Sequence, residues 1–438
     1  MRVVIELVLL ALIFFIAVQL CKKKIFIMLM SLIGYYLFSD YILFMAGYDI
    51  GELALGKMYV EIIFLLLFFT AVINYMQRVR SRRDKSINLY ELLFIGVMIF
   101  LPVLLMVLGA VNNGLANSIN GWRAIFLPIV LVELILFIGA AEVSSDRFWN
   151  RVVFFVIYLS LFNSVYAIFQ YITYSGYVFD SWRYDLLLDA REVVGGERGN
   201  LNEHFLKYQI ERNENLRSSG FMVSALTFGY FTALALVFSL RQLLTTVIPI
   251  KSLFWLLISI CLLGGVYVSQ VRTALIISAL GLGLFFWIGL FKPRPNIILA
   301  VSLLSPLVVV AGSLFFASYL DPSSQGRIVQ YSDLLNNFSP LGYGLGSYLG
   351  QFDSYYIHIF MTLGLFAFIP LGYFVIKLKG LISVASYDND DGLLRVVLAL
   401  SMVLFTVFFV QHIASSLYYF CSILFITGIV RKKIGAVS

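Results

Sequence analysis

Continuous apolar runs of about 20 residues recur along the whole chain, and this feature restricts the possible folds more than any other. A helix of that length crosses the hydrocarbon core of a bilayer. In lipid the backbone must satisfy its own hydrogen bonds, which limits membrane spans to helices and closed barrels. The runs do not alternate at every second residue, which excludes a barrel. The sequence therefore predicts an all-α, polytopic transmembrane helical bundle.

The composition excludes a soluble globular chain, because only 13% of residues are charged and 61% are hydrophobic. Soluble domains average about 25% charged residues. The net charge of +7 comes mainly from short basic loops, so it does not indicate a nucleic-acid partner. Cys21, Cys261 and Cys421 lie in or beside apolar runs, without the spacing of a disulfide framework or metal site. We expect no metal, no other cofactor and no nucleic acid.

Short basic loops orient the chain, since lysine and arginine concentrate on the cytoplasmic side. The strongest of them are residues 22–24, 78–85 and 431–433. The first apolar run, residues 3–20, has no clear small-residue cleavage site and ends at lysines, so we interpret it as a retained span. These signals predict about 13 spans (range about 12–14) with the N-terminus outside.

The spans and two large outward-facing loops divide the chain into five segments. Spans are predicted over about 3–20, 25–45, 91–111, 123–141, 152–174, 221–240 and 355–376. Others end near residues 75, 269, 291 and 320, and a final hairpin surrounds residues 411–412. The segments are 1–174 (N-terminal helices), 175–220 (first loop), 221–320 (central helices), 321–354 (second loop) and 355–438 (C-terminal helices).

Both loops contain local structural signals. The first is too long and too charged for a simple connector, and residues 204–212 (HFLKYQIER) fit a short helix on the membrane surface. In the second, Ser323 or Ser324 is expected to cap a short helix that carries Arg327. A glycine-rich turn, SPLGYGLGSY, follows that helix.

Three arginines lie on the outer side, where basic residues should be scarce: Arg217, Arg272 and Arg327. A single such arginine is more often a topological remnant or a snorkelling side chain. Three on one face are harder to explain in that way. Arginine forks bind phosphate in a bidentate manner, and a helix N-terminus favours anions. We therefore predict a site for a lipid-linked pyrophosphate at the outer leaflet.

Four segments resemble the family of O-antigen polymerases (Wzy type) and O-antigen ligases. They are RSSGFMVSALTFGYF, SQVRTALIISALGLG, GRIVQYSDLLNNFSPLGYGLGSY and DSYYIHIFMTLGLFAFIPLGYF, and they lie between residues 217 and 374. The resemblance implies a GT-C-like membrane glycosyltransferase in the bacterial inner membrane, with its active site facing the periplasm. Such enzymes join saccharides carried on undecaprenyl pyrophosphate and use neither nucleotide sugars nor metals.

The chain departs from the ligases at one position. Where ligases have a His-Asn pair, this chain has Asp353 and Ser354, which is more like a polymerase. Asp353 is the first candidate for the base that deprotonates an acceptor hydroxyl, and Arg272 completes the catalytic set. Asp353 fits equally well as the N-cap of the following span. His358, one turn later, either assists or is a buried, hydrogen-bonded histidine.

Tyrosines around these residues have two interpretations. Tyr331, Tyr343 and Tyr355 could stack on sugar rings, but an interfacial aromatic belt explains tyrosines as well. Asp185, in the first loop, either lines an acceptor groove or pairs with arginines of that loop.

The expected function is that of a polysaccharide polymerase. It would transfer a growing glycan from undecaprenyl pyrophosphate to an incoming lipid-linked repeat unit, in contact with membrane lipids and with a chain-length regulator and a flippase as partners. One alternative is a ligase that transfers the polymer to an outer-core acceptor. Another is a lipid-linked oligosaccharide flippase or transporter, which predicts a charged cavity at mid-membrane. The predicted spans carry almost no internal charge, which disfavours transport.

Overall fold

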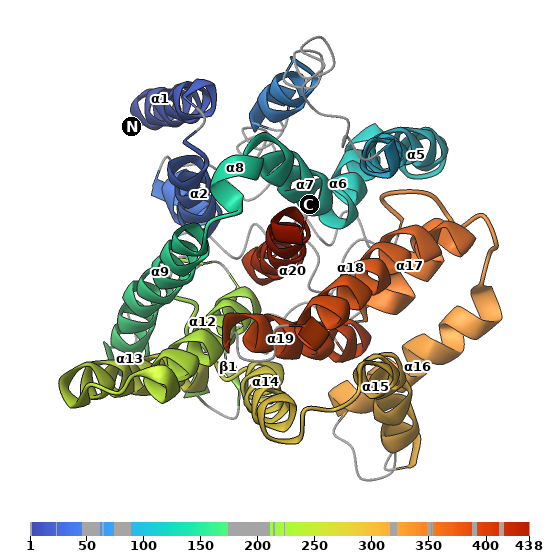
Figure 1. Ribbon diagram of the computed structural model, residues 1–438. Helices are drawn as coiled ribbons and strands as arrows, with labels where there is room; N and C mark the ends of the chain where they lie inside the picture. Colours follow the sequence, from blue (N-terminus) through green and yellow to red (C-terminus); the bar gives the residue numbers. More distant parts are fainter. Residues whose placement is uncertain are drawn as a thin grey trace. The chain divides into compact units, whose positions relative to one another are not determined.

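The computed structural model is helical in nearly all of the residues it describes (Figure 1). These are residues 2–22, 24–45, 62–63, 65–73, 89–173, 211–212, 215–222, 224–315, 322–347, 352, 354–387, 392–410 and 416–437. The predicted all-helical fold class is confirmed. The short helix predicted over residues 204–212 is wrong at its C-terminal end, because β1 (Glu211–Arg212) pairs antiparallel with β2 (Asn215–Leu216).

The helices pack into two compact units, each made of separate stretches of sequence. Unit 1 contains Met1–Tyr75 and Phe137–Ala279, and unit 2 contains Met76–Leu136 and Leu280–Ser438. The helices of unit 1 are α1 (Arg2–Cys21), α2 (Ile25–Met45), α8 (Ala140–Val143), α9 (Asp146–Thr173), α12 (Ala225–Thr245) and α13 (Pro249–Val268).

Unit 2 contains the other described helices apart from α14. These helices are α5 (Leu89–Asn113), α6 (Leu115–Ile125), α7 (Leu127–Ile138), α15 (Pro295–Phe315), α16 (Pro322–Asn337), α17 (Tyr355–Leu363), the 3₁₀ turn η4 (Gly364–Ala367), α18 (Phe368–Tyr387), α19 (Gly392–Val410) and α20 (Leu417–Val437). One more helix, α14 (Arg272–Phe291), begins in unit 1 and ends in unit 2.

Most of the described helices overlap predicted spans, but α6 and α7 divide the span predicted over residues 123–141, and α18 continues beyond residue 376. Among the described residues, five helical stretches are long and apolar enough to cross a membrane: α9, α12, α13, α14 and Tyr355–Ala385. The pair α6 and α7, bent by 52°, gives a sixth, and α1, α2, α5, α15 and α19 contain shorter apolar helices. The span predicted to end near residue 75 falls largely outside the described residues.

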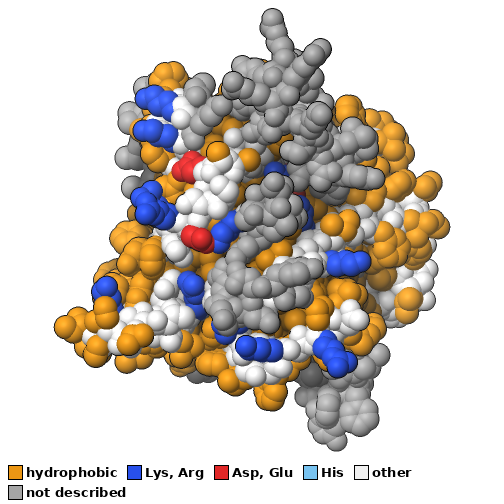
Figure 2. Space-filling view, in the orientation of Figure 1, with side chains coloured by type: hydrophobic (Ala, Val, Ile, Leu, Met, Phe, Trp, Pro, Cys, Tyr) orange, Lys and Arg blue, Asp and Glu red, His pale blue; other side chains and the backbone are white. Residues whose placement is uncertain are grey.

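Apolar side chains cover much of the surface that faces the viewer in Figure 2. Large hydrophobic residues such as Phe14, Phe100, Phe162 and Leu290 are more than half exposed. In water such a surface would aggregate, whereas in a bilayer it faces lipid tails. The chain is therefore a multi-pass membrane protein by helix length and hydropathy.

The glycine-rich loop of unit 2, residues 340–347, fills the break between α17 and η4. Gly364, with φ +58°, ends α17 and leaves the carbonyls of its last turn without helical partners. The backbone N–H groups of Tyr343 and Gly344 donate to the carbonyls of Met361 and Thr362 at 3.1 and 3.0 Å. Leu365, at the start of η4, donates to the carbonyl of Pro340 at 2.8 Å. The loop thus satisfies both sides of the break.

The other side of this loop packs on the α5–α6 hairpin. A Cβ at Gly344 would lie 2.7 Å from the Cα of Gly109, and one at Gly346 would overlap the backbone of Asn117. Both loop glycines have φ +88°, a conformation that side chains disfavour. Ser118 adds a hydrogen bond from its hydroxyl to the carbonyl of Leu345 at 3.0 Å. Glycine is therefore required here for close packing.

The helix predicted in the second large loop is present as α16, but its predicted cap is wrong. The helix begins at Pro322 and already includes Ser323 and Ser324. Proline suits the first helical position, because its missing N–H would have no partner there and its φ is preset.

Replacing Gly344 with alanine is expected to lower the free energy of unfolding by about 1–3 kcal/mol, because of its positive φ and the contact with Gly109. The matched control is Gly372→Ala in α18, where a Cβ meets nothing within 4 Å. Thermal unfolding of the purified protein in lipid nanodiscs measures both. Equal unfolding temperatures for the two variants would contradict the packing described for the loop.

Candidate functional site

Arg217 begins a segment, residues 217–222, that is buried inside unit 1. Its side chain is 2% exposed, and its Nε lies 3.5 Å from the carbonyl oxygen of Ser269. Ser218 donates its backbone N–H to the carbonyl of Val268 at 3.0 Å. These carbonyls end α13, where the helix dipole favours a positive charge. The C-terminus of α13 therefore helps to hold the Arg217 guanidinium in place.

The turn between α13 and α14 connects this contact to Arg272. Gln270 has φ +53°, which is uncommon for a residue with a Cβ. Ser269 closes the turn, since its hydroxyl accepts the Val271 N–H at 3.3 Å and donates to the Val266 carbonyl at 2.6 Å. Arg272 follows as the first residue of α14, with an exposed side chain. The structure thus brings two of the three predicted arginines to one turn.

Two buried amide side chains of α9 fix the segment that follows Arg217. Gln170 bonds both backbone groups of Gly220, accepting its N–H at 2.9 Å and donating to its carbonyl at 3.0 Å. Asn163 accepts the Phe221 N–H at 2.8 Å. The Phe221 ring stacks on Tyr166, with ring centroids 4.2 Å apart. A buried loop must satisfy its backbone groups, and α9 supplies the partners for this one.

Part of the predicted site falls outside the described residues. Asp185 and Asp353 lie outside the described residues. The backbone of Arg327 lies in α16, but its side chain is not described. The N-cap of α17 is Ser354, whose side chain accepts the Ile357 N–H. The capping role that was the alternative for Asp353 is therefore taken by the next residue.

The remaining predicted residues lie on or beside α17. His358 is 1% exposed. The Tyr331 hydroxyl of α16 lies 2.8 Å from the Ser354 hydroxyl, so this tyrosine joins α16 to the start of α17. Tyr355 is fully buried, 3.2 Å from the Tyr419 hydroxyl, which places it in the core and not in an interfacial belt or on a sugar-binding surface. Tyr343 is 37% exposed and donates to the Asn337 carbonyl at 3.0 Å.

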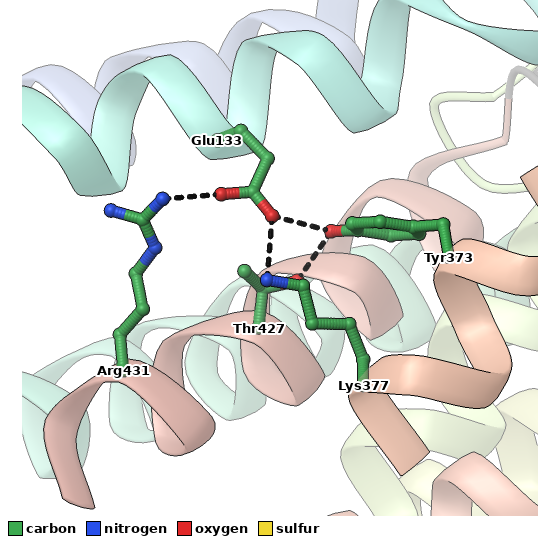
Figure 3. A network of polar contacts seen from close by, with 5 residues as sticks. All are labelled: Glu133, Tyr373, Lys377, Thr427 and Arg431. Atoms are coloured by element: carbon green, nitrogen blue, oxygen red, sulfur yellow. Dashed lines mark hydrogen bonds and ion pairs between the residues drawn. The ribbon is translucent and has the colours of Figure 1, made fainter. Parts of the chain in front are cut away.

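A buried ionic network in unit 2 is a feature that the sequence reasoning missed (Figure 3). Glu133, in the middle of α7 and 3% exposed, pairs with Lys377 of α18 at 2.8 Å and with Arg431 of α20 at 2.6 Å. The Tyr373 hydroxyl donates to the same carboxylate at 3.1 Å and lies 2.6 Å from the Thr427 hydroxyl. One carboxylate therefore connects three helices.

This network corrects one expectation and is an exception to another, that the spans carry almost no internal charge. The predicted span 355–376 ended before Lys377, but α18 continues to Tyr387, so Lys377 is a helix residue. The spans also contain an internal charge, because Glu133 lies within an apolar helix, LPIVLVELILFI. That single acidic residue was the available signal, since ionisable groups inside membrane spans usually have a partner and a role.

The fold defines the class of this chain as a multi-pass helical membrane protein. No protein-family model, curated protein or solved structure matches it. Within the described residues, no group of three His, Cys, Asp or Glu side chains could hold a metal ion. Inferences about function therefore depend on the arrangement of the chain's own residues.

Glu133→Gln is expected to lower the free energy of unfolding by about 3–5 kcal/mol, because it leaves the cations of Lys377 and Arg431 without their buried carboxylate. Ser305→Ala is the control, since it removes one hydrogen bond between helices of unit 2, to Thr406 at 2.8 Å. That loss should cost about 0.5–1.5 kcal/mol. Thermal unfolding in nanodiscs gives both values. If Glu133→Gln is no less stable than Ser305→Ala, the network does not hold the helices together.

Proposed function

We propose that this protein is a polysaccharide polymerase of the bacterial inner membrane. It transfers a growing glycan from undecaprenyl pyrophosphate to an incoming lipid-linked repeat unit at the periplasmic face. One observation carries the proposal. Arg217 is held against the turn that immediately precedes Arg272, so residues from two separate motifs of the resemblance to O-antigen polymerases meet at one place.

The two arginines support the proposal through their different environments. Arg217 is buried against the end of α13, while Arg272 is exposed at the start of α14. A guanidinium beside the N-terminus of a long helix is a favourable setting for a phosphate group. Arg327, whose motif belongs to the same resemblance, is the third proposed ligand of the pyrophosphate.

The proposed reaction is a substitution at the anomeric carbon of the growing chain. The acceptor hydroxyl oxygen forms a bond to that carbon as the bond to the pyrophosphate oxygen breaks, and lipid pyrophosphate leaves with the electron pair. Asp353 takes the proton of the acceptor hydroxyl. The arginines stabilise the negative charge that develops on the leaving group. Because Ser354 caps α17, Asp353 is not needed for that structural role.

Arg272→Ala is expected to lower the polymerisation rate by about 100-fold to 1,000-fold, as loss of one preorganised charge-stabilising donor does elsewhere. The assay incubates the full-length protein in nanodiscs with a synthetic lipid-pyrophosphate-linked repeat unit and resolves the products by size. The control is Arg294→Ala, an exposed arginine in the basic loop between α14 and α15.

The products also distinguish the alternatives. A normal ladder of chain lengths from Arg272→Ala would contradict the proposal. A wild-type protein that makes no polymer, but moves preformed polymer onto an outer-core acceptor, would be a ligase.

A second candidate function, a flippase or transporter for lipid-linked oligosaccharides, is favoured by the Glu133 network. Buried ionisable groups in membrane helices are typical of transport pathways. On this hypothesis, neutralising Glu133 and Lys377 together would stop translocation of a fluorescent lipid-linked oligosaccharide across liposomes. Polymer formation in the same preparation, without translocation, would exclude this hypothesis.

A further inference from the structure

The Glu133 network has no part in the proposed reaction, yet it belongs to a closed series of contacts in unit 2. From Glu133 the chain runs back along α7 and through the 52° bend into α6. In α6, Ser118 forms a hydrogen bond with the glycine-rich loop, residues 340–347, and Gly121 packs closely against it. That loop fills the break between α17 and η4.

Helix α18 connects the last member of this series of contacts back to Glu133. This helix follows η4 directly in the chain, and its Tyr373 and Lys377 return to the Glu133 carboxylate. The helix pair α17–α18 is thus fixed at two places, by the loop at its break and by Glu133 further along. Between them lie only η4 and the first turns of α18.

The network suits a positioning role better than a purely stabilising one. A buried ion pair adds little stability relative to apolar residues of similar volume, because desolvation offsets most of the attraction. Its directional hydrogen bonds, however, specify one arrangement. Apolar contacts alone would allow α18 to rotate or slide, whereas donors on α18 and α20 that meet one carboxylate would not.

We infer that Glu133 is a positioning residue for the acceptor side of the proposed site, acting through α18 on α17. The inference rests on the proposed function, because α17 matters there as the helix that carries His358. Glu133 contacts no substrate in this scheme. It fixes the position of α17, the helix that carries His358.

The test uses the double variant Glu133→Gln/Lys377→Gln, in the full chain in nanodiscs. The three charges of the network sum to +1 before the change (−1 + 2) and to +1 after it, when only Arg431 is charged. The double variant therefore leaves one cation, Arg431, without its carboxylate, whereas the single Glu133→Gln variant leaves two. Tyr373→Phe, which removes one hydroxyl, is a milder second variant, and Ser305→Ala is again the control.

Two readouts separate positioning from simple destabilisation. In hydrogen exchange, backbone amides of α17 should exchange at least about tenfold faster in both network variants, with those of α12 unchanged. In the polymerisation assay, kcat should fall at least about tenfold while KM for the donor lipid stays constant. Ser305→Ala should change neither readout.

The inference would be overturned if both network variants exchanged the amides of α17 as slowly as the wild-type protein. It would also be overturned if both variants had the kcat of the wild-type protein. If the wild-type protein itself forms no polymer, the proposed function fails. The exchange readout then still decides whether Glu133 positions α17, because it does not depend on activity.

Discussion

The structure depends on one constraint: every backbone polar group that leaves a helix inside an apolar environment must find a partner within the protein. Residues 217–222 meet this requirement with the amide side chains of α9 and the carbonyls that end α13. Residues 340–347 meet it by joining the two sides of the break at Gly364. Both segments lie in, or at the edge of, the polar loops that the sequence predicts outside the membrane, and each also contacts a helix that is distant in the chain.

Buried charged side chains also need partners within the protein, and leaving them without a partner costs more free energy than leaving a backbone group without one. Arg217 is buried where the carbonyls of α13 face it, and Glu133 is buried where an ammonium, a guanidinium and a phenol hydroxyl converge. In an environment of low polarity, such placements persist only if partners are fixed. A cation held beside a turn is suited to anion recognition, and a carboxylate that joins three helices is suited to fixing their positions.

The candidate site was only partly predictable from the sequence. Arg217 and Arg272 were selected because they lie on the side with few basic residues, and the structure brings their segments together at the Ser269 turn. Tyr355 was selected for its position beside Asp353, but it is buried against Tyr419. The ionic network of Glu133 is not predictable from the sequence, because its partners are 240 residues or more away in the chain and no local pattern connects them.

Hydropathy by itself determined the helical class and the approximate positions of most of the described apolar helices. These properties are local, since a run of apolar residues must form a helix to satisfy its backbone in lipid. The tertiary structure decided where α17 breaks, why glycine occupies residues 342, 344 and 346, and which cations share Glu133. These features depend on the approach of distant segments, and the same apolar helices could pack in many ways until close glycine contacts and directional polar bonds select one.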